Sequence, residues 1–170
     1  MKNFAKTFLV IITSVIFVSC GKEQFNRDYR VAKDGLIYKY GSNELFTGLV
    51  IDTSDVIISF EVVNGIKNGA FITFYRNGKY EKYGLIEDNK NVGEWCYFYP
   101  NGQLESTGSF ENNKSNGRWA FYYPDGKIKM EGTYKDSEQH GRWKYFNSKG
   151  ELVNIFTFYN GILCNSQIKA

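Results

Sequence analysis

The stretch GEWCYFYPNGQLESTGSF, residues 93–110, decides the fold, because its pattern returns every 24 residues along the chain. Glycines mark this period in three series: Gly69, Gly93, Gly117 and Gly141; Gly78, Gly102, Gly126 and Gly150; and Gly84, Gly108 and Gly132, after which Phe156 takes the place of the glycine. A fixed period of this length indicates an array of structural repeats.

Each unit holds two runs rich in aromatic and β-branched residues, joined by a short pair that ends in glycine. The four pairs are Asn77-Gly78, Asn101-Gly102, Asp125-Gly126 and Lys149-Gly150. Such pairs predict two-residue type I′ turns, in which both central residues have positive φ. The sequence therefore predicts an all-β fold, a single-sheet-like solenoid of antiparallel β-hairpins.

The turns also predict which residues face one another across each hairpin. Trp95 is expected opposite Gly108, which makes room for its ring, whereas Phe156 opposite Trp143 is expected to push one ring aside. Alternation predicts a core face and a wet face. We expect the core face to carry Trp95, Trp119 and Trp143, together with the column Tyr80, Leu104, Ile128 and Leu152.

A second aromatic column, Phe74, Phe98, Tyr122 and Phe146, is predicted on the face away from the core. Rings repeated at this spacing suit an extended peptide or glycan, so the column is the candidate binding face. The alternative is a stabilising ladder, in which these rings pack on one another and on lysine stems such as those of Lys82 and Lys129.

The unit Gly-x-Trp-x-x-(Phe/Tyr)-Tyr-Pro-(Asn/Asp)-Gly resembles the MORN repeat, and in particular its bacterial variant in the YwqK antitoxin-like family. The resemblance covers residues 48–160 approximately. It implies four MORN-like repeats at 69–160, preceded by an N-terminal cap and a degenerate first repeat at 31–68 and followed by a C-terminal tail at 161–170. It also implies an alternative role, an antitoxin-like protein that binds and neutralises a toxin or effector.

The first twenty residues have the features of a secretory signal: Met1, Lys2 and Lys6, an apolar run over 8–18, and the small Ser19 before Cys20. They resemble a bacterial lipobox, although Phe17 stands where leucine is usual. We expect a lipoprotein signal peptide at 1–19, acylated Cys20 and a tether at 20–30. This places the protein in the cell envelope, lipid-anchored on the periplasmic or outer-membrane side. An ordinary signal peptide or an uncleaved anchor are the alternatives.

Little in the sequence points to catalysis. His140 is the single histidine, the glycines fall in turns rather than in a phosphate loop, and Glu81 and Glu105 on the wet face lie too far apart for a glycosidase pair. We therefore expect no enzyme activity, no metal and no cofactor. The exported Cys96 and Cys164 are separated by almost three units, farther than a disulfide reaches, so two free thiols are predicted.

Composition narrows the choice of partner. The 21 Lys and Arg include Lys2 and Lys6, which leaves 19 basic against 18 acidic side chains once the signal is removed. This balance does not favour nucleic acid. The sequence predicts a membrane-anchored, non-catalytic protein-interaction scaffold with a protein partner, and lipid or glycan binding ranks below it. Open sheet edges also make an edge-to-edge homodimer possible.

Overall fold

A computed structural model describes residues 29–32, 35–53 and 57–168, which form thirteen strands and no helix. The strands are β1 Tyr29–Val31, β2 Ile37–Lys39, β3 Gly48–Asp52, β4 Ile57–Val63, β5 Ile66–Phe74, β6 Tyr80–Glu87, β7 Lys90–Phe98, β8 Leu104–Glu111, β9 Lys114–Tyr122, β10 Ile128–Lys135, β11 Glu138–Phe146, β12 Leu152–Tyr159 and β13 Ile162–Ile168.

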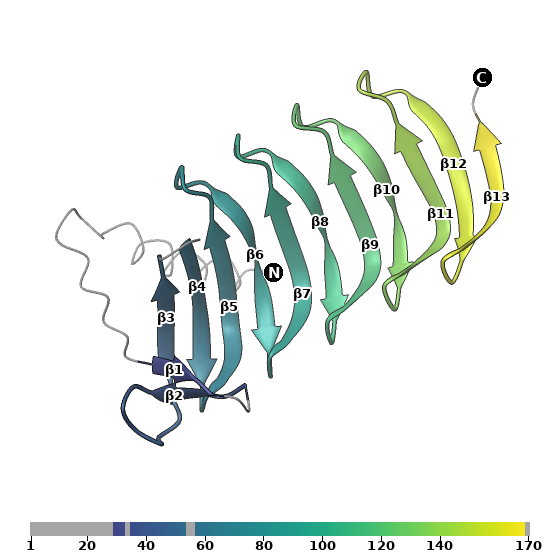
Figure 1. The fold of residues 1–170 in the computed structure, drawn as a ribbon. Coiled ribbons are helices and arrows are strands. Elements are labelled where there is room, and N and C mark those ends of the chain that lie inside the picture. Colours follow the sequence, from purple (N-terminus) through teal and green to yellow (C-terminus); the bar gives the residue numbers. More distant parts are fainter. Residues whose placement is uncertain (1–28, 33–34, 54–56, 169–170) are drawn as a thin grey trace, which may run out of the picture.

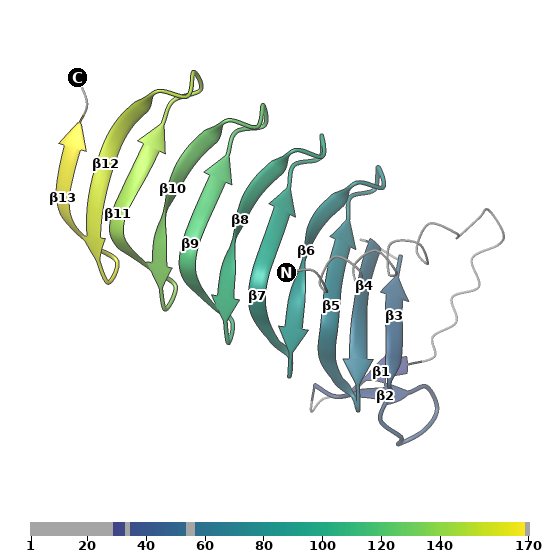
Figure 2. The same ribbon diagram turned by 180° about the vertical axis from the view of Figure 1, so that it is seen from behind.

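Eleven of these strands, β3 to β13, form one antiparallel sheet in which every strand pairs with its neighbours in sequence. The sheet is a long, twisted single layer that ends at β3 and at β13 without closing (Figures 1 and 2). The predicted all-β array of consecutive hairpins is confirmed. The segment 161–170, expected as a tail, contributes the edge strand β13.

The turns at the upper edge of Figure 1, called here the upper turns, differ from the prediction. Gly102 N–H donates to Tyr99 O (2.8 Å), and Tyr99 N–H donates to Gln103 O (2.9 Å). Gly102 has φ +88°, whereas Asn101 is not among the residues with positive φ. This is a three-residue loop, a type I turn followed by a left-handed glycine. The prediction of two-residue type I′ turns at these positions was wrong.

Two-residue turns of the type I′ kind occur instead at the opposite edge, called here the lower turns. Their pairs are Asn64-Gly65, Asp88-Asn89, Asn112-Asn113, Asp136-Ser137 and Asn160-Gly161, and both residues of each pair have positive φ. Consecutive lower turns are joined by hydrogen bonds: Asn113 N–H donates to Asn91 O (3.0 Å), and Asn91 N–H donates to Asn113 Oδ1 (2.7 Å). The polar pair recurs every 24 residues, so the sequence also contains a periodic signal for the lower turns.

Replacing Ser137 with Asn is expected to stabilise the protein by about 0.5–1 kcal/mol, because Asn tolerates the left-handed conformation (φ +71°) better than Ser. Ser137 Oγ accepts a hydrogen bond from Ser115 N–H (3.0 Å). Asn113 Oδ1 makes the same bond one unit earlier, so Ser137→Asn should keep it. Urea unfolding measures the change. The reverse change, Asn113→Ser, should lower stability by a similar amount, and a gain there would contradict the argument.

The tryptophan rings connect each hairpin to the one before it. The predicted pairing of Trp95 with Gly108 is confirmed. The ring, however, lies over Gly84 of the preceding unit, where an added Cβ would overlap it. The indole Nε1–H donates to Leu85 O (3.2 Å), again in the preceding unit. Trp119 lies over Gly108 and Trp143 over Gly132 in the same way. The glycines therefore serve contacts between repeats, not contacts within one hairpin.

This arrangement overturns the expectation that Phe156 displaces a ring. Trp143 pairs with Phe156 in register, but its ring lies over Gly132, and Trp143 is 0% exposed. On its other side Phe156 faces Ser166 of β13, so no later indole needs the space that glycine leaves in the earlier units. A ring is thus compatible with the last unit.

At the N-terminal end a small core is closed by the separate two-stranded sheet of β1 and β2. Ile37 is buried with Val50, Phe60 and Val62, and four half-buried side chains pack against this cluster: Tyr29, Phe46, Ile58 and Phe71. Backbone hydrogen bonds attach the segment to the first lower turn, where Ile37 N–H donates to Gly65 O (2.8 Å). This end of the tryptophan face is covered by chain that precedes the repeats.

Candidate binding face

A bulge beside each upper turn decides which side chains share the face away from the tryptophans, called here the outer face. Tyr97 pairs with Ser106, but the next pair is Phe98 with Leu104, so Glu105 is left without a partner. Residues directly opposite one another lie on the same face. Leu104 therefore lies with Phe98 on the outer face. The same shift occurs beside the other upper turns.

The bulges join two columns into one apolar strip on the outer face. The outer strip consists of Phe74, Tyr80, Phe98, Leu104, Tyr122, Ile128, Phe146 and Leu152, on strands β5 to β12 along the upper turns. The expected place of the column Tyr80, Leu104, Ile128 and Leu152 on the core face was wrong. Simple alternation failed because one extra residue per hairpin reverses the facing of the residues beyond it.

The rings at the first end of the strip touch one another. Phe74 stacks on Tyr80 with ring centroids 5.0 Å apart, Tyr80 lies 6.2 Å from Phe98, and Tyr83 lies 5.5 Å from Phe98. Farther along, aliphatic side chains pair with the rings: Leu104 with Phe98, Ile128 with Tyr122, and Leu152 with Phe146. The strip is thus a packed layer as well as a surface.

Seven of the eight side chains of the strip are half-buried, and the eighth, Ile128, is exposed at 36%. The two lysines expected to cover the outer column belong elsewhere. Lys82 Nζ lies 5.8 Å from the Phe71 ring centroid, and Lys129 Nζ lies 5.9 Å from that of Tyr123. Both rings are outside the strip. An apolar layer that remains partly open to solvent can accept an apolar partner.

Below the strip the outer face becomes polar. Glu131 on β10 forms ion pairs with Arg118 (2.6 Å) and Lys144 (3.3 Å) from the two neighbouring strands. The hydrogen bond from Arg118 lowers the pKa of Glu131 against the effect of partial burial, and Lys144 lowers it further. This cross-strand trio was not predicted, since only the register brings the three residues together.

Both predicted free thiols are confirmed: Cys96 is half-buried and Cys164 is exposed. Cys96 Sγ lies 3.6 Å from Thr107 Oγ1 on the neighbouring strand. Burial raises the pKa of Tyr83, and a hydrogen bond with Cys96 raises it further. Burial and this hydrogen bond therefore favour the protonated form of Tyr83.

The glutamates weighed as a catalytic pair lie beside the upper-turn bulges, where alternation does not place them on the outer face. Burial raises the pKa of Tyr75, and the negative charges of Glu81 and then Glu105 raise it further. Tyr75 donates from its hydroxyl to Phe98 O in the next unit (2.7 Å). The two carboxylates thus lie near a tyrosine that links repeats.

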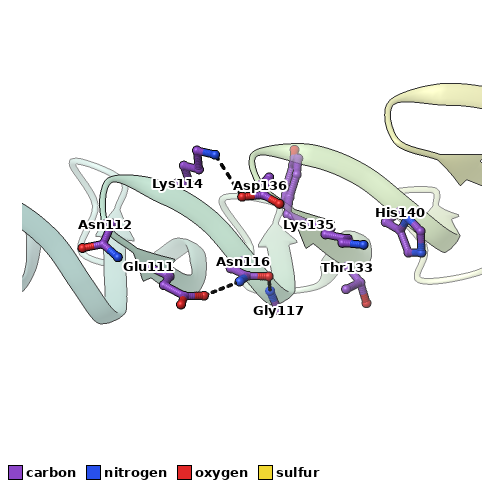
Figure 3. Close-up of a pocket in the computed structure, with 10 residues that line it drawn as sticks. Glu111, Asn112, Lys114, Asn116, Gly117, Thr133, Lys135, Asp136 and His140 are labelled. Carbon is purple, nitrogen blue, oxygen red and sulfur yellow. Dashed lines mark hydrogen bonds and ion pairs between the residues drawn. The ribbon is translucent and has the colours of Figure 1, made fainter.

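His140 lies on β11 at one end of a polar hollow of about 640 Å³, between the β8–β9 turn and the end of β10 (Figure 3). Its ring lies 5.4 Å from that of Tyr159, and Nδ1 is buried without a hydrogen-bond partner. Four of the polar lining side chains are paired with one another, Lys114 with Asp136 (3.0 Å) and Asn116 with Glu111 (2.6 Å).

Other predicted sites have a simple outcome. Cys20 lies outside the described residues. Within the part of the chain that the structure describes, no three or more His, Cys, Asp or Glu side chains gather as metal ligands. No helix in the described ranges is long and apolar enough to cross a membrane.

Two solved structures show a distant likeness to this chain. A crystal structure of a mutant of S. aureus TarM in complex with fondaparinux, α-GlcNAc-glycerol and UDP matches with 13% identity and a TM-score of 0.32, over 69% of this chain and 20% of that one. A crystal structure of TarM matches with 14% identity and a TM-score of 0.30, over 68% and 21%. The chain thus spans about a fifth of the length of these proteins. No curated protein matches.

A comparison with family models is more specific. The model of the MORN repeat variant matches twice, at residues 91–112 and 115–136. Each match begins near the start of a strand, β7 or β9, and extends through the following strand to the next lower turn. These are consecutive hairpins in the middle of the sheet, and it is these two hairpins that are similar to the MORN repeat variant.

Proposed function

We propose that this protein is a lipid-anchored, non-catalytic scaffold of the cell envelope, which holds a protein partner on its outer strip. The observation that carries the proposal is the strip itself. It is an apolar layer that runs across four hairpins along one edge of the sheet and that ends at a polar region containing Glu131. An apolar centre with a polar rim is the usual composition of a protein-binding surface.

The geometry of the strip favours an extended segment of a protein. One ring per repeat falls at Phe74, Phe98, Tyr122 and Phe146, and adjacent strands lie about 4.8 Å apart, so successive rings are about 10 Å apart. Three residues of a polyproline II segment span about 9.3 Å and bring the side chain back to the same side, so an extended segment of this kind can place one apolar side chain between each two consecutive rings. Repeat arrays commonly bind partners along such periodic surfaces.

The anchor is supported by the resemblance of the segment before Cys20 to a lipobox. Acyl chains on Cys20 would hold the sheet at a membrane surface through buried methylene groups. Mass spectrometry of the mature N-terminus tests this part of the proposal. Acylation of Cys20 in the wild-type protein, and its loss in Cys20→Ala, would support the anchor. An unmodified N-terminus upstream of Cys20 would overturn it.

The binding face is tested by replacing all four rings of the column with leucine: Phe74→Leu, Phe98→Leu, Tyr122→Leu and Phe146→Leu. Leucine keeps the strip apolar, so the sheet should remain folded by circular dichroism. We expect capture of the partner by crosslinking in the native envelope to fall about tenfold or more, because aromatic side chains dominate binding energy at such surfaces.

The matched control changes three exposed residues beside the lower turns, at the far end of strands that carry the strip: Glu87→Ala, Lys90→Ala and Glu138→Ala. It should leave capture unchanged. Equal capture by the wild-type protein and the leucine variant would refute the outer strip as the binding face. Capture of a toxin or effector would identify the antitoxin-like alternative, and binding of the unacylated chain to protein-free vesicles would favour lipid recognition.

A further inference from the structure

The C-terminal edge of the sheet is the most exposed strand of the fold. β13 pairs with β12 on one side and with no described strand on the other (Figure 1). Residues 162–167 are all exposed, with Ile162 at 70% and Leu163 at 53%. The neighbouring Tyr159 is 63% exposed. An edge of this kind offers unpaired backbone groups to another strand.

Charge sets this edge apart from the rest of the sheet. Every strand from β3 to β11 carries at least one Asp, Glu, Lys or Arg, whereas β12 and β13 carry none. Charged side chains, especially lysine, are one means by which natural edge strands avoid pairing with other chains. β13 lacks this protection, and two antiparallel copies of it would bring no like charges together.

The hydrogen-bonding pattern shows which residues of β13 face the open edge. Asn147 N–H donates to Glu151 O (2.9 Å), so this pair is hydrogen-bonded. Along an antiparallel ladder, hydrogen-bonded and non-hydrogen-bonded pairs alternate. Counting from Asn147–Glu151 along β11 and β12, with the bulge included, makes Trp143–Phe156 a hydrogen-bonded pair. Phe156 thus directs its N–H and C=O to β11. Its partner Ser166 consequently directs its own away from β12.

We propose that β13 pairs antiparallel with β13 of a second copy of this chain, with the two-fold axis beside Ser166. Each Ser166 then exchanges both backbone hydrogen bonds with its counterpart, and the two sheets join into one continuous sheet. Such pairing uses the same strand on both sides and closes as a dimer, whereas pairing of β13 with β3 would continue into a filament. The inference stands independently of the proposed function.

The register makes the test sharp. In this arrangement the two Ser166 Cα atoms lie about 5.5 Å apart, within the range that a disulfide spans. Gln167 faces Asn165 of the other copy, so the two Gln167 Cα atoms are separated by two further residues along the strand, on the order of 8 Å or more. A cysteine at 166 should crosslink two chains, and a cysteine at 167 should not.

The experiment uses the full-length chain with Cys20→Ala, Cys96→Ala and Cys164→Ala, so that neither acylation nor a native thiol joins two copies. Sedimentation velocity should give twice the mass of one chain. On oxidation, Ser166→Cys should form the disulfide-linked dimer and Gln167→Cys should not. Ser166→Pro removes only an outward N–H, so it should keep the circular dichroism spectrum and weaken association about tenfold or more.

Four results would overturn the inference. The first is a single-chain mass at every concentration. The second is equal crosslinking at 166 and 167, which indicates random collision. The third is a ladder of sizes beyond the dimer, which indicates head-to-tail pairing of β13 with β3. Unchanged association of a folded Ser166→Pro chain would also place the contact away from the β13 edge.

Discussion

Trp143→Ala is expected to lower the free energy of unfolding by about 3–5 kcal/mol, as large-to-small changes of buried tryptophan generally do. Trp143 is 0% exposed, packs edge-on against Tyr134 at 4.9 Å between ring centroids, and donates from Nε1 to Thr133 O (3.1 Å). Alanine would leave a cavity and an unpaired carbonyl. Equilibrium unfolding in urea measures the loss.

The position of Trp143 also predicts where the damage appears. Because its ring lies on β10 while its backbone belongs to β11, Trp143→Ala should reduce hydrogen-exchange protection in β11 to β13 more than in β5 to β7. Trp143→Phe is the control: it retains most of the apolar contact and loses the indole hydrogen bond, so a loss of about 1–2 kcal/mol is expected. A loss under about 1 kcal/mol for Trp143→Ala would contradict the bridging role.

Gly108→Val is expected to destabilise the protein by about 3 kcal/mol or more. A Cβ at Gly108 would overlap the ring of Trp119, which is buried and hydrogen-bonded to Ser109 O (3.2 Å). Overpacking of a filled site forces the neighbours to move, and here both neighbours belong to a paired sheet. Thermal and urea unfolding measure the change.

Gly117→Asn serves as the matched glycine control for this position. Gly117 has φ +81° but no atom within 4 Å of an added Cβ, and asparagine tolerates that conformation, so the loss should stay within about 1 kcal/mol. A double-mutant cycle identifies the neighbour of Gly108. Gly108→Ala should couple to Trp119→Phe and be nearly additive with Trp95→Phe. Coupling to Trp95 instead would show that Gly108 contacts the tryptophan of its own hairpin.

Much of the architecture could be predicted because the repeat is strict. The 24-residue period, the upper-turn glycines and the alternation of apolar residues gave the hairpins, their order and the pairing of Trp95 with Gly108. The free thiols followed from the same arithmetic, since distance along an array is proportional to the number of strands between two residues. These are local or periodic properties, which the order of residues encodes directly.

The candidate site was harder to predict, because small local departures change the facing of side chains. The bulge at Glu105 moves Leu104 beside Phe98, and the residue types at these positions do not predict a bulge. Three of the five lower turns, Asp88-Asn89, Asn112-Asn113 and Asp136-Ser137, lack the glycine that usually marks a type I′ turn, so the series was missed although Asn64-Gly65 and Asn160-Gly161 carry it. Asparagine and aspartate also accept the left-handed conformation, so their recurrence every 24 residues was a usable signal for these turns.

The sequence by itself determined that this protein is a row of antiparallel hairpins with the tryptophans on one face and the aromatic column Phe74, Phe98, Tyr122 and Phe146 on the other. Only the tertiary structure decided what those side chains touch. Trp119 could lie over the glycine of its own hairpin or of the one before it, and the twist of the packed sheet places it over Gly108 of the preceding unit. Pairing is encoded along the chain, but ring contacts and bulges depend on neighbouring hairpins that lie side by side only after folding.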